Sequence, residues 1–543
     1  MKTVIKDIES QVNAALPIND FFWDGDLSSL NYGTQEIRNC LLNFKAPIIA
    51  VNNKDSVGYS NKGHIQNSKN GKANVVGWLP ALSITRFGDP EFRKTYRVKA
   101  AYYAGGMANA IASEDLVITL GRSDLMGSFG SGGLSLDRLA SAIDTVQTEL
   151  QNAPYMFNLL HNPFEPKVEQ STVELFLEKD VRVVEAAAYI RLTPAVVQYR
   201  AAGLSRDKSG NIHANNHIIA KISRKEIAQL FLQPAPEKML QDLVSAGKIS
   251  QSQAELANLV PLADDVTVEA DSGGHTDNQP LVSLLPSIIA LRDKIQEQYQ
   301  FEKPTRIGAA GGISTPGSIL GAYMMGAAFV VTGSINQACV ESGASEHTRK
   351  LLSQAAMADV TMAPSADMFE LGARVQVLKK GSLFPMRAQK LYDLYSTYSS
   401  IEEIPITVRE DLETKIFKRK IEDVWQDTVA FFEKHNPGQI AKAIQNPKKK
   451  MALIFRWYLG LTSRWSRDGV EDRKMDYQIW CGPSMGAFNE WVQGTHLDDL
   501  TNRHVDDIAW QLLNGCMYVS RVQGLKLQGL SFPSHLETYY PQL

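Results

Sequence analysis

The middle of the sequence alternates short apolar runs with amphipathic segments, and the runs can be counted. Eight occur, at residues 98–105, 125–130, 155–160, 181–189, 217–223, 265–271, 305–312 and 327–334. Each is nearly continuous in apolar residues, as expected of strands that are buried on both faces of a parallel sheet. Eight such strands, each followed by a helix over roughly 250 residues, predict an α/β protein with a (β/α)8 (TIM) barrel. A doubly wound open sheet is the alternative.

The interval between the fifth and sixth runs is far longer than the few residues that a connection needs. Residues 223–264 contain two or three helical segments, so we predict a helical insertion there. Chemistry in such barrels lies at the carboxyl ends of the strands. We therefore expect the insertion to cover that end of the barrel.

The pattern of apolar, polar and glycine residues divides the chain into three parts. Residues 1–95 form an N-terminal appendage, in which the polar, glycine-bearing stretch 52–77 is predicted to be a loop. Residues 96–395 hold the predicted barrel with its insertion. Residues 396–543 continue in helical patterns without glycine-ended strands and predict a C-terminal helical domain. A chain of 543 residues is long enough for two or three domains.

Composition excludes several classes of protein. The chain is 44% hydrophobic and 21% charged, with a formal net charge of -3, which is typical of a globular protein and not of one that coats nucleic acid. The N-terminus is charged where a signal peptide needs an apolar core, and no apolar run approaches the roughly 20 residues of a membrane span. We therefore expect a cytoplasmic protein. Its four scattered cysteines favour neither disulfides nor a structural metal.

Glycines follow five of the eight predicted strands. Glycine lacks a Cβ atom, so it lets backbone N–H groups approach a ligand closely. A single pair such as Gly273 and Gly274, before His275, is also compatible with a tight turn, but five glycine-rich ends on one rim predict a binding site. Phosphate in such barrels often binds after the seventh and eighth strands. Those positions hold Gly311, Gly312, Gly333 and Ser334.

Long and unusual motifs carry a resemblance to a known family. They are AGGMANAIASEDLV, YMFNLLHNP, YRAAGLSRD, VEADSGGHTDN, VTGSINQACVESGASEHTRKLL, MALIFRWYLGLTSRW and MDYQIWCGPSMGAFN. The chain resembles the PfaD family, the trans-acting enoyl reductases of polyunsaturated fatty acid synthases and of polyketide synthases with separate acyltransferases. The barrel is also similar to FabK-type enoyl reductases and to nitronate monooxygenases.

The resemblance implies a cofactor, a reductant and a partner. The cofactor is FMN, bound without a covalent bond, and the reductant is NADPH or NADH. The substrate is a 2-enoyl thioester on an acyl carrier protein, within a megasynthase. Pathway, acyl length, choice of nicotinamide and oligomeric state, a homodimer included, stay open.

The resemblance also implies roles for single residues. His275 matches the histidine of the FabK-type motif and is expected to donate a hydrogen bond or a proton where negative charge gathers on the thioester. Lys221 is expected to place a cation near the N1/C2 edge of the flavin, with a solvated lysine as the alternative. Asp271 and Asp277 either orient His275 or cap backbone N–H groups. The expected cofactor-binding residues are Gly105, Gly106, Met107, Asn158, Lys221, Gly273, Gly274, Gly311, Gly312, Gly333 and Ser334.

Two segments have two interpretations each. The stretch 446–467 interleaves basic residues with Trp457 and Trp465, and is either a core helix with a solvated basic start or a docking face for an acidic carrier protein. Within the insertion, Phe231 and Met239 either line an acyl channel or pack the insertion against the barrel.

Three other functions compete with enoyl reduction. A nitronate monooxygenase-like oxidase would use FMN without a nicotinamide, but the motifs shared with carrier-dependent synthases disfavour it. A barrel like that of IMP dehydrogenase needs a loop cysteine, and none occurs in the predicted barrel before Cys339. A non-catalytic assembly subunit of a megasynthase would not need His275 or the glycine-rich strand ends.

Overall fold

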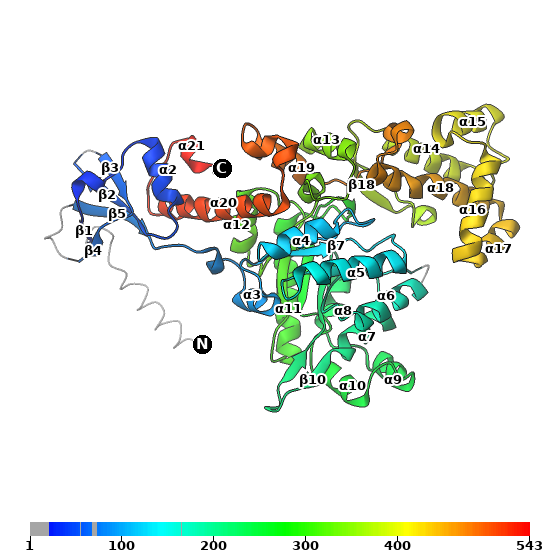
Figure 1. The fold of residues 1–543 in the computed structure, drawn as a ribbon, viewed down its shortest axis with the longest axis horizontal. Coiled ribbons are helices and arrows are strands. Elements are labelled where there is room, and N and C mark those ends of the chain that lie inside the picture. Colours follow the sequence, from blue (N-terminus) through cyan, green and yellow to red (C-terminus); the bar gives the residue numbers. More distant parts are fainter. Residues whose placement is uncertain (1–20, 55, 68–72, 164–165, 543) are drawn as a thin grey trace. The chain divides into compact units, whose positions relative to one another are not determined.

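A computed structural model describes residues 21–54, 56–67, 73–163 and 166–542. The chain forms two compact units (Figure 1). One contains residues 1–87 and 511–541, and the other contains residues 88–510 and 542–543. Helix α20 (Val505–Lys526) contributes residues to both. The expected three-part division at residues 95 and 395 stays a prediction.

The first unit contains a five-stranded antiparallel sheet with the order β3-β2-β5-β1-β4. Its strands are β1 (Phe22–Asp24), β2 (Ile48–Asn53), β3 (Ser56–Ser60), β4 (His64–Gln66) and β5 (Ala73–Leu79). Trp23, Val51 and Val75 bury one face of the sheet. The loop predicted for 52–77 is therefore wrong where the structure describes it, and residues 55 and 68–72 lie outside the described ranges. These strands are too short for their alternation to stand out in the sequence.

The second unit contains the predicted barrel, which is confirmed. It is closed in the order β12-β13-β15-β16-β6-β7-β8-β9, and all its strand pairs are parallel. The strands are β6 (Tyr102–Ala104), β7 (Met126–Phe129), β8 (Met156–Leu160), β9 (Val183–Ala187), β12 (His217–Ile222), β13 (Asp265–Glu269), β15 (Arg306–Ala310) and β16 (Val330–Thr332). Each falls within one of the eight apolar runs.

Helices surround the barrel (Figure 1). They are α3 (Pro90–Tyr96), α4 (Glu114–Arg122), α5 (Leu136–Leu150), α6 (Pro166–Glu178), α7 (Pro194–Ala202), α8 (Lys225–Leu232), α11 (Leu281–Tyr299) and α12 (Pro316–Met324). Ser113 and Ser135 cap α4 and α5, and Thr193 caps α7, each by accepting a backbone N–H from the first turn. The sequence thus marks where each of these helices begins.

The insertion lies at the opposite end of the barrel from the expected one. Its added helices, α9 (Glu237–Ser245) and α10 (Gln251–Ala257), follow the ordinary crossover helix α8 and pack against α7. Gln253 donates to the carbonyl of Ala202, the last residue of α7, at 2.8 Å. The insertion therefore interrupts the return to the amino end of β13, where the hairpin of β10 (Leu204–Arg206) and β11 (Ile212–Ala214) also lies (Figure 1).

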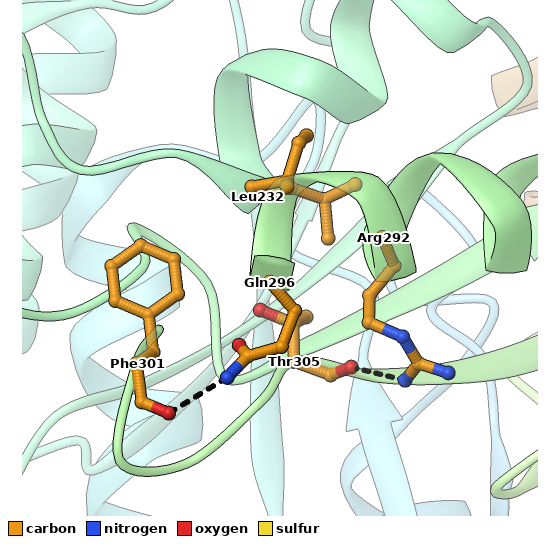
Figure 2. A pocket seen from close by; sticks show the side chains of 6 residues that line it. Leu232, Arg292, Gln296, Phe301 and Thr305 are labelled. Carbon is orange, nitrogen blue, oxygen red and sulfur yellow. Dashed lines mark hydrogen bonds between the residues drawn. The ribbon is translucent and has the colours of Figure 1, made fainter. Parts of the chain in front are cut away.

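A small recess lies between α8, α11 and the start of β15. Figure 2 shows that its polar groups are already paired: Arg292 donates to the carbonyl of Thr305 at 2.8 Å, and Gln296 donates to that of Phe301 at 2.8 Å. It leaves no space for a molecule of water. This recess is a packing feature and not a ligand site.

The chain after the barrel adds a small sheet and a helical region. In the sheet, β18 (Arg374–Leu378) pairs with β17 (Val360–Pro364) on one side and with the short β14 (Gly274–His275) on the other. The helices are α13 (Glu346–Ser353), α14 (Phe384–Thr397), α15 (Ile406–Asp411), α16 (Ile421–His435), α17 (Pro437–Gln445), α18 (Pro447–Asp468) and α19 (Ser484–Val492). Of these, α14, α15, α16 and α18 share an apolar core that includes Phe369, Phe384, Phe417 and Phe455.

Three further properties bear on the site. Among the residues that the structure describes, none of the helices combines the length and apolarity that a membrane crossing requires. The described ranges also contain no cluster of three His, Cys, Asp or Glu side chains suited to a metal ion. All four cysteines are buried free thiols.

Candidate active site

A carboxylate inside the barrel accepts hydrogen bonds from residues of three neighbouring strands, β6, β7 and β8, and from the residue Gly106 that follows β6. Glu185 of β9 is fully buried, and its Oε2 accepts the backbone N–H of Gly106 at 2.8 Å and the hydroxyl of Ser128 at 2.9 Å. The hydroxyl of Tyr103 donates to its Oε1 at 3.2 Å, and the side-chain amide of Asn158 donates to its Oε2 at 3.3 Å. A buried carboxylate needs such partners, because its desolvation is otherwise costly.

Lys221 of β12 supplies the counter-charge. Its Nζ lies 3.7 Å from Oε1 of Glu185 and 3.6 Å from Oε1 of Glu269, on β13. Burial opposes the charge of Lys221, but the two carboxylates outweigh burial and raise its pKa. The pKa of Glu269 is raised as well, but here burial is the cause, and the charge of Lys221 offsets this only in part. Lys221 is thus a largely buried, paired cation, with 15% of its side chain exposed, and not a solvated lysine.

Sequence reasoning does not single out Glu185 and Glu269. The signal that could have found them is an acid inside a run that is otherwise apolar, as in VRVVEAAAY and DVTVEAD. A strand buried on both faces tolerates a carboxylate only where a cation or hydrogen-bond donors pair with it. Lys221, in HIIAKIS, is that cation.

Gly106, which follows β6, is required by this network. A Cβ atom on Gly106 would lie 2.7 Å from Oε2 of Glu185 and 3.0 Å from Cβ of Asn158. The N–H of Gly105 donates to the carbonyl of Thr332 in β16 at 2.9 Å. Met107 follows, partly buried. The hydrogen bond from Gly106 to Glu185 therefore fixes the backbone at the carboxyl end of β6 from inside the barrel.

His275 stands outside the barrel, on β14. Its Nε2 lies 3.2 Å from Oδ1 of Asp367, and 48% of its side chain is exposed. Burial lowers the pKa of His275, but the hydrogen bond and charge of Asp367, together with the charge of Glu269, outweigh burial and raise it. The hydroxyl of Ser272 donates to Oε1 of Glu269 at 3.3 Å. That contact joins the turn carrying His275 to the buried charges of the barrel.

The two acids beside His275 in the sequence bind elsewhere. Asp277 accepts hydrogen bonds from Arg224 at 2.7 Å and from Ser223 at 2.6 Å. Asp271 accepts one from Gln376 at 2.7 Å. The acid that contacts His275 is Asp367, which lies 92 residues further along the chain.

The glycine pair before His275 lets the chain pack on itself. A Cβ atom on Gly273 would lie 2.8 Å from the backbone nitrogen of Cys481. Gly274 has φ +83°, in the left-handed region that favours glycine. The missing Cβ atom of Gly273 thus makes room for the segment around Cys481, and a role of Gly273 in binding the cofactor stays a prediction.

The glycines after β15 and β16 divide into packed and open positions. A Cβ atom on Gly311 would lie 2.7 Å from the backbone carbon of Ala270, so this glycine is packed. A Cβ atom on Gly312 or Gly333 would meet no atom within 4 Å. Only these last two leave room for a ligand beside the backbone.

Two serines stand beside these glycines. The hydroxyl of Ser334 accepts the N–H of Gly482 at 3.1 Å, so it is engaged within the chain. The hydroxyl of Ser314 is buried and has no partner among the described residues. An open glycine backbone with an unpaired hydroxyl nearby suits an anionic oxygen-rich group such as a phosphate. Nothing in the sequence around Ser314 distinguishes it as a binding residue.

The basic residues of α18 are mostly engaged within the chain. Lys449 and Arg456 lie 2.5 and 3.3 Å from the carboxylate of Glu370. Lys448 and Lys450 lie over aromatic rings, 4.9 and 5.4 Å from the ring centroids. The middle of α18 is buried in the helical core. The core-helix interpretation is therefore correct for the middle of the helix. Its basic start is paired within the chain instead of solvated, and these residues do not form a free docking face.

Comparisons with known proteins agree with the resemblance. Residues 23–82 match the N-terminal domain of fatty acid synthase subunit PfaD, and residues 398–477 match the inserted helical domain of [acyl-carrier-protein] S-malonyltransferase. The chain is 46% identical to one of the polyunsaturated fatty acid synthase subunits of Thraustochytrium sp., over 92% of this chain and 34% of that protein. It is also 46% identical to polyketide biosynthesis protein PksE of Bacillus subtilis, over 85% of this chain and 59% of that protein.

This chain also matches a solved structure over that structure's whole length. It is the enoyl reductase domain of MlnA, from the macrolactin biosynthesis cluster of Bacillus amyloliquefaciens, with 38% identity and a TM-score of 0.78. The match covers 82% of this chain and 100% of that one. By contrast, the chain spans only about a third of the Thraustochytrium protein and about three fifths of PksE. The agreement in motifs, barrel and full-domain match shows that this chain belongs to the PfaD family of enoyl reductases.

Proposed function

We propose that the chain reduces the 2,3 double bond of an enoyl thioester on an acyl carrier protein, using FMN and NADPH or NADH. The observation that carries this proposal is the match to the whole of the MlnA enoyl reductase domain. The pathway is the synthesis of a polyketide or a polyunsaturated fatty acid, as the names of the relatives suggest. The partners are the carrier and the other components of a megasynthase.

The carboxyl rim of the barrel suits a flavin mononucleotide. The open backbone at Gly312 and Gly333 and the unpaired hydroxyl of Ser314 would hold the phosphate. Lys221 would place its positive charge beside the ring system. When bound, FMN supplies a hydride to the β-carbon of the enoyl group.

Residues of the chain supply the remaining chemistry. As hydride arrives at the β-carbon, negative charge gathers on the thioester oxygen, and the α-carbon then takes up a proton. The raised pKa of His275 favours the protonated imidazole, which can stabilise that charge and give the proton. Glu185 holds Gly106 and Lys221 in place at the end of the barrel where the cofactor would bind.

The purified full-length chain tests the proposal. It should be yellow, release FMN on denaturation, be bleached by NADPH or NADH without oxygen, and regain its colour on addition of an enoyl-pantetheine thioester. A nitronate monooxygenase-like oxidase would instead be bleached by a nitronate and recoloured by oxygen. A non-catalytic assembly subunit would bind no flavin under any condition, and either result would refute the proposal.

A further inference from the structure

The turn that carries His275 is held by a residue that follows the barrel in the sequence. Gln376 of β18 donates through Nε2 to Oδ1 of Asp271 at 2.7 Å and to the carbonyl of Ser272 at 2.8 Å. Its Oε1 accepts the side-chain amide of Asn278 at 3.2 Å. Gln376 is itself buried, with 5% of its surface exposed. These contacts fix the chain on both sides of His275.

A second residue from the same hairpin reaches the imidazole. Asp367 lies in the connection between β17 and β18, and its Oδ1 is 3.2 Å from Nε2 of His275. The pairing of His275 with Val375 in β18 brings the two together. The charged groups that act on the imidazole are Asp367, from the hairpin, and Glu269, from the barrel. Both are acids, so both favour the imidazolium.

We infer that Asp367 is the positioning residue of His275: it engages Nε2, so that Nδ1 is the ring nitrogen presented to the substrate. The inference rests on the proposed function, in which His275 serves the enoyl thioester. When Nε2–H donates to a carboxylate, the neutral ring keeps its lone pair on Nδ1, and the protonated ring carries its transferable proton there.

The proton transfer then has defined atoms. The Nδ1–H bond of the imidazolium breaks, and a C–H bond forms at the α-carbon of the substrate, while the hydride goes to the β-carbon. The electron pair of the former N–H bond stays on Nδ1, leaving a neutral ring whose Nε2–H still donates to Asp367. Solvent returns the proton to Nδ1 before the next cycle. Asp367 stays ionised throughout.

The test observes the imidazole itself in the full-length, flavin-loaded protein. Protein labelled with ¹⁵N in its histidine rings is titrated by NMR, and His275 is assigned from the spectrum of His275→Gln. The wild type should show the Nε2–H tautomer and a protonation midpoint above that of Asp367→Asn. Asp367→Glu, which keeps the charge, should restore most of the difference.

A matched control separates positioning from a general loss of negative charge. Asp277 is two residues from His275 but pairs with Arg224, so Asp277→Asn should leave the tautomer and midpoint of His275 unchanged. Equal tautomers and midpoints in the wild type and Asp367→Asn would overturn the inference. So would an Asp277→Asn effect as large as that of Asp367→Asn.

Kinetics provide a second readout. Because the imidazolium is the active form, reoxidation of the reduced flavin by an enoyl thioester should fail at a lower pH in Asp367→Asn than in the wild type. Reduction by NADPH should be unaffected. The NMR result does not depend on turnover. If the chain reduced no enoyl thioester, the proposed function would be refuted, but the NMR titration would still decide whether Asp367 positions His275.

Discussion

Nζ of Lys221 lies 3.7 Å from Oε1 of Glu185, on neighbouring strands inside the closed barrel. Oε1 of Glu269, on the other neighbouring strand, lies 3.6 Å from the same Nζ, so one cation serves two carboxylates. Buried charges of this kind are weak evidence for stability, because their desolvation offsets much of their attraction. What the arrangement does provide is a fixed cation directly below the rim at which the cofactor is proposed to bind.

Replacing Lys221 by methionine should therefore destabilise the fold by about 3 kcal/mol, the cost of leaving a buried charge without its partner. The loss should grow with pH. Without the cation, the pKa of Glu269, which burial already raises, should rise further, so that its carboxyl group stays protonated in the folded state. A group whose pKa is raised on folding costs stability as pH rises, by at most about 1.4 kcal/mol per pH unit for one proton.

Urea unfolding of Lys221→Met at pH 6 and pH 8 measures this effect. The wild type is the reference at both pH values. Its Lys221 stays charged because its pKa is raised, and groups such as His275 titrate in both proteins, so the extra loss of stability in Lys221→Met at the higher pH measures the effect. Lys225→Met, at an exposed lysine of α8, is the control and should behave as the wild type. An equal loss of stability relative to the wild type at the two pH values would contradict a coupled triad of Lys221 and the two carboxylates.

The phosphate site is best tested at Gly333. A valine there should prevent FMN binding, because its side chain would fill the open space beside the backbone. Gly333 has φ -132°, outside the left-handed region, whereas Gly312 has φ +74°, where any side chain would strain the backbone. Gly321→Val is the control, at an equally open, exposed position of α12. Flavin absorbance per chain should approach zero in the first variant and stay at one FMN in the second. Full flavin content in Gly333→Val would place the phosphate elsewhere.

The barrel could be predicted from the sequence because strands buried on both faces leave continuous apolar runs. The N-terminal sheet could not, because strands such as β1 and β4 have three residues each and show no period. The helices of 223–264 are visible in the sequence, but their place is not. Helix α8 runs along the outside of the barrel, back to the amino ends of the strands, and α9 and α10 follow it there.

The residues of the candidate site could likewise be predicted from the sequence only in part. Lys221, His275 and the glycine-rich strand ends stand out because each is unusual in its own stretch of sequence. Asp367 does not, because nothing local connects it to a histidine 92 residues away. The use of each glycine is also hidden: Gly106 and Gly273 make room for the protein itself, and Gly312 and Gly333 leave open space.

His275→Ala should keep FMN but slow enoyl reduction by about 10²- to 10³-fold, the usual cost of one lost stabilising donor. Reduction of the flavin by NADPH, which needs no such donor, should keep its rate. Stopped-flow measurement of the two half-reactions separates these effects. His213→Ala, at an exposed histidine of the β10–β11 hairpin, is the control. If both half-reactions of His275→Ala match the wild type, His275 is only a turn residue.

Phe231 should act on stability and not on substrate choice. Its side chain is fully buried, and its ring packs edge-on against Tyr189 with 5.5 Å between centroids. It therefore offers no surface to an acyl chain, and the helices that follow it lie away from the carboxyl rim. Phe231→Ala should lower the free energy of unfolding by about 3–5 kcal/mol, the usual cost of such a cavity. Phe231→Leu, which keeps most of the volume, should recover much of this. The ratio of rates on short and long enoyl thioesters should stay at the wild-type value in both variants, and a change in that ratio in the folded Leu variant would restore the acyl-channel interpretation.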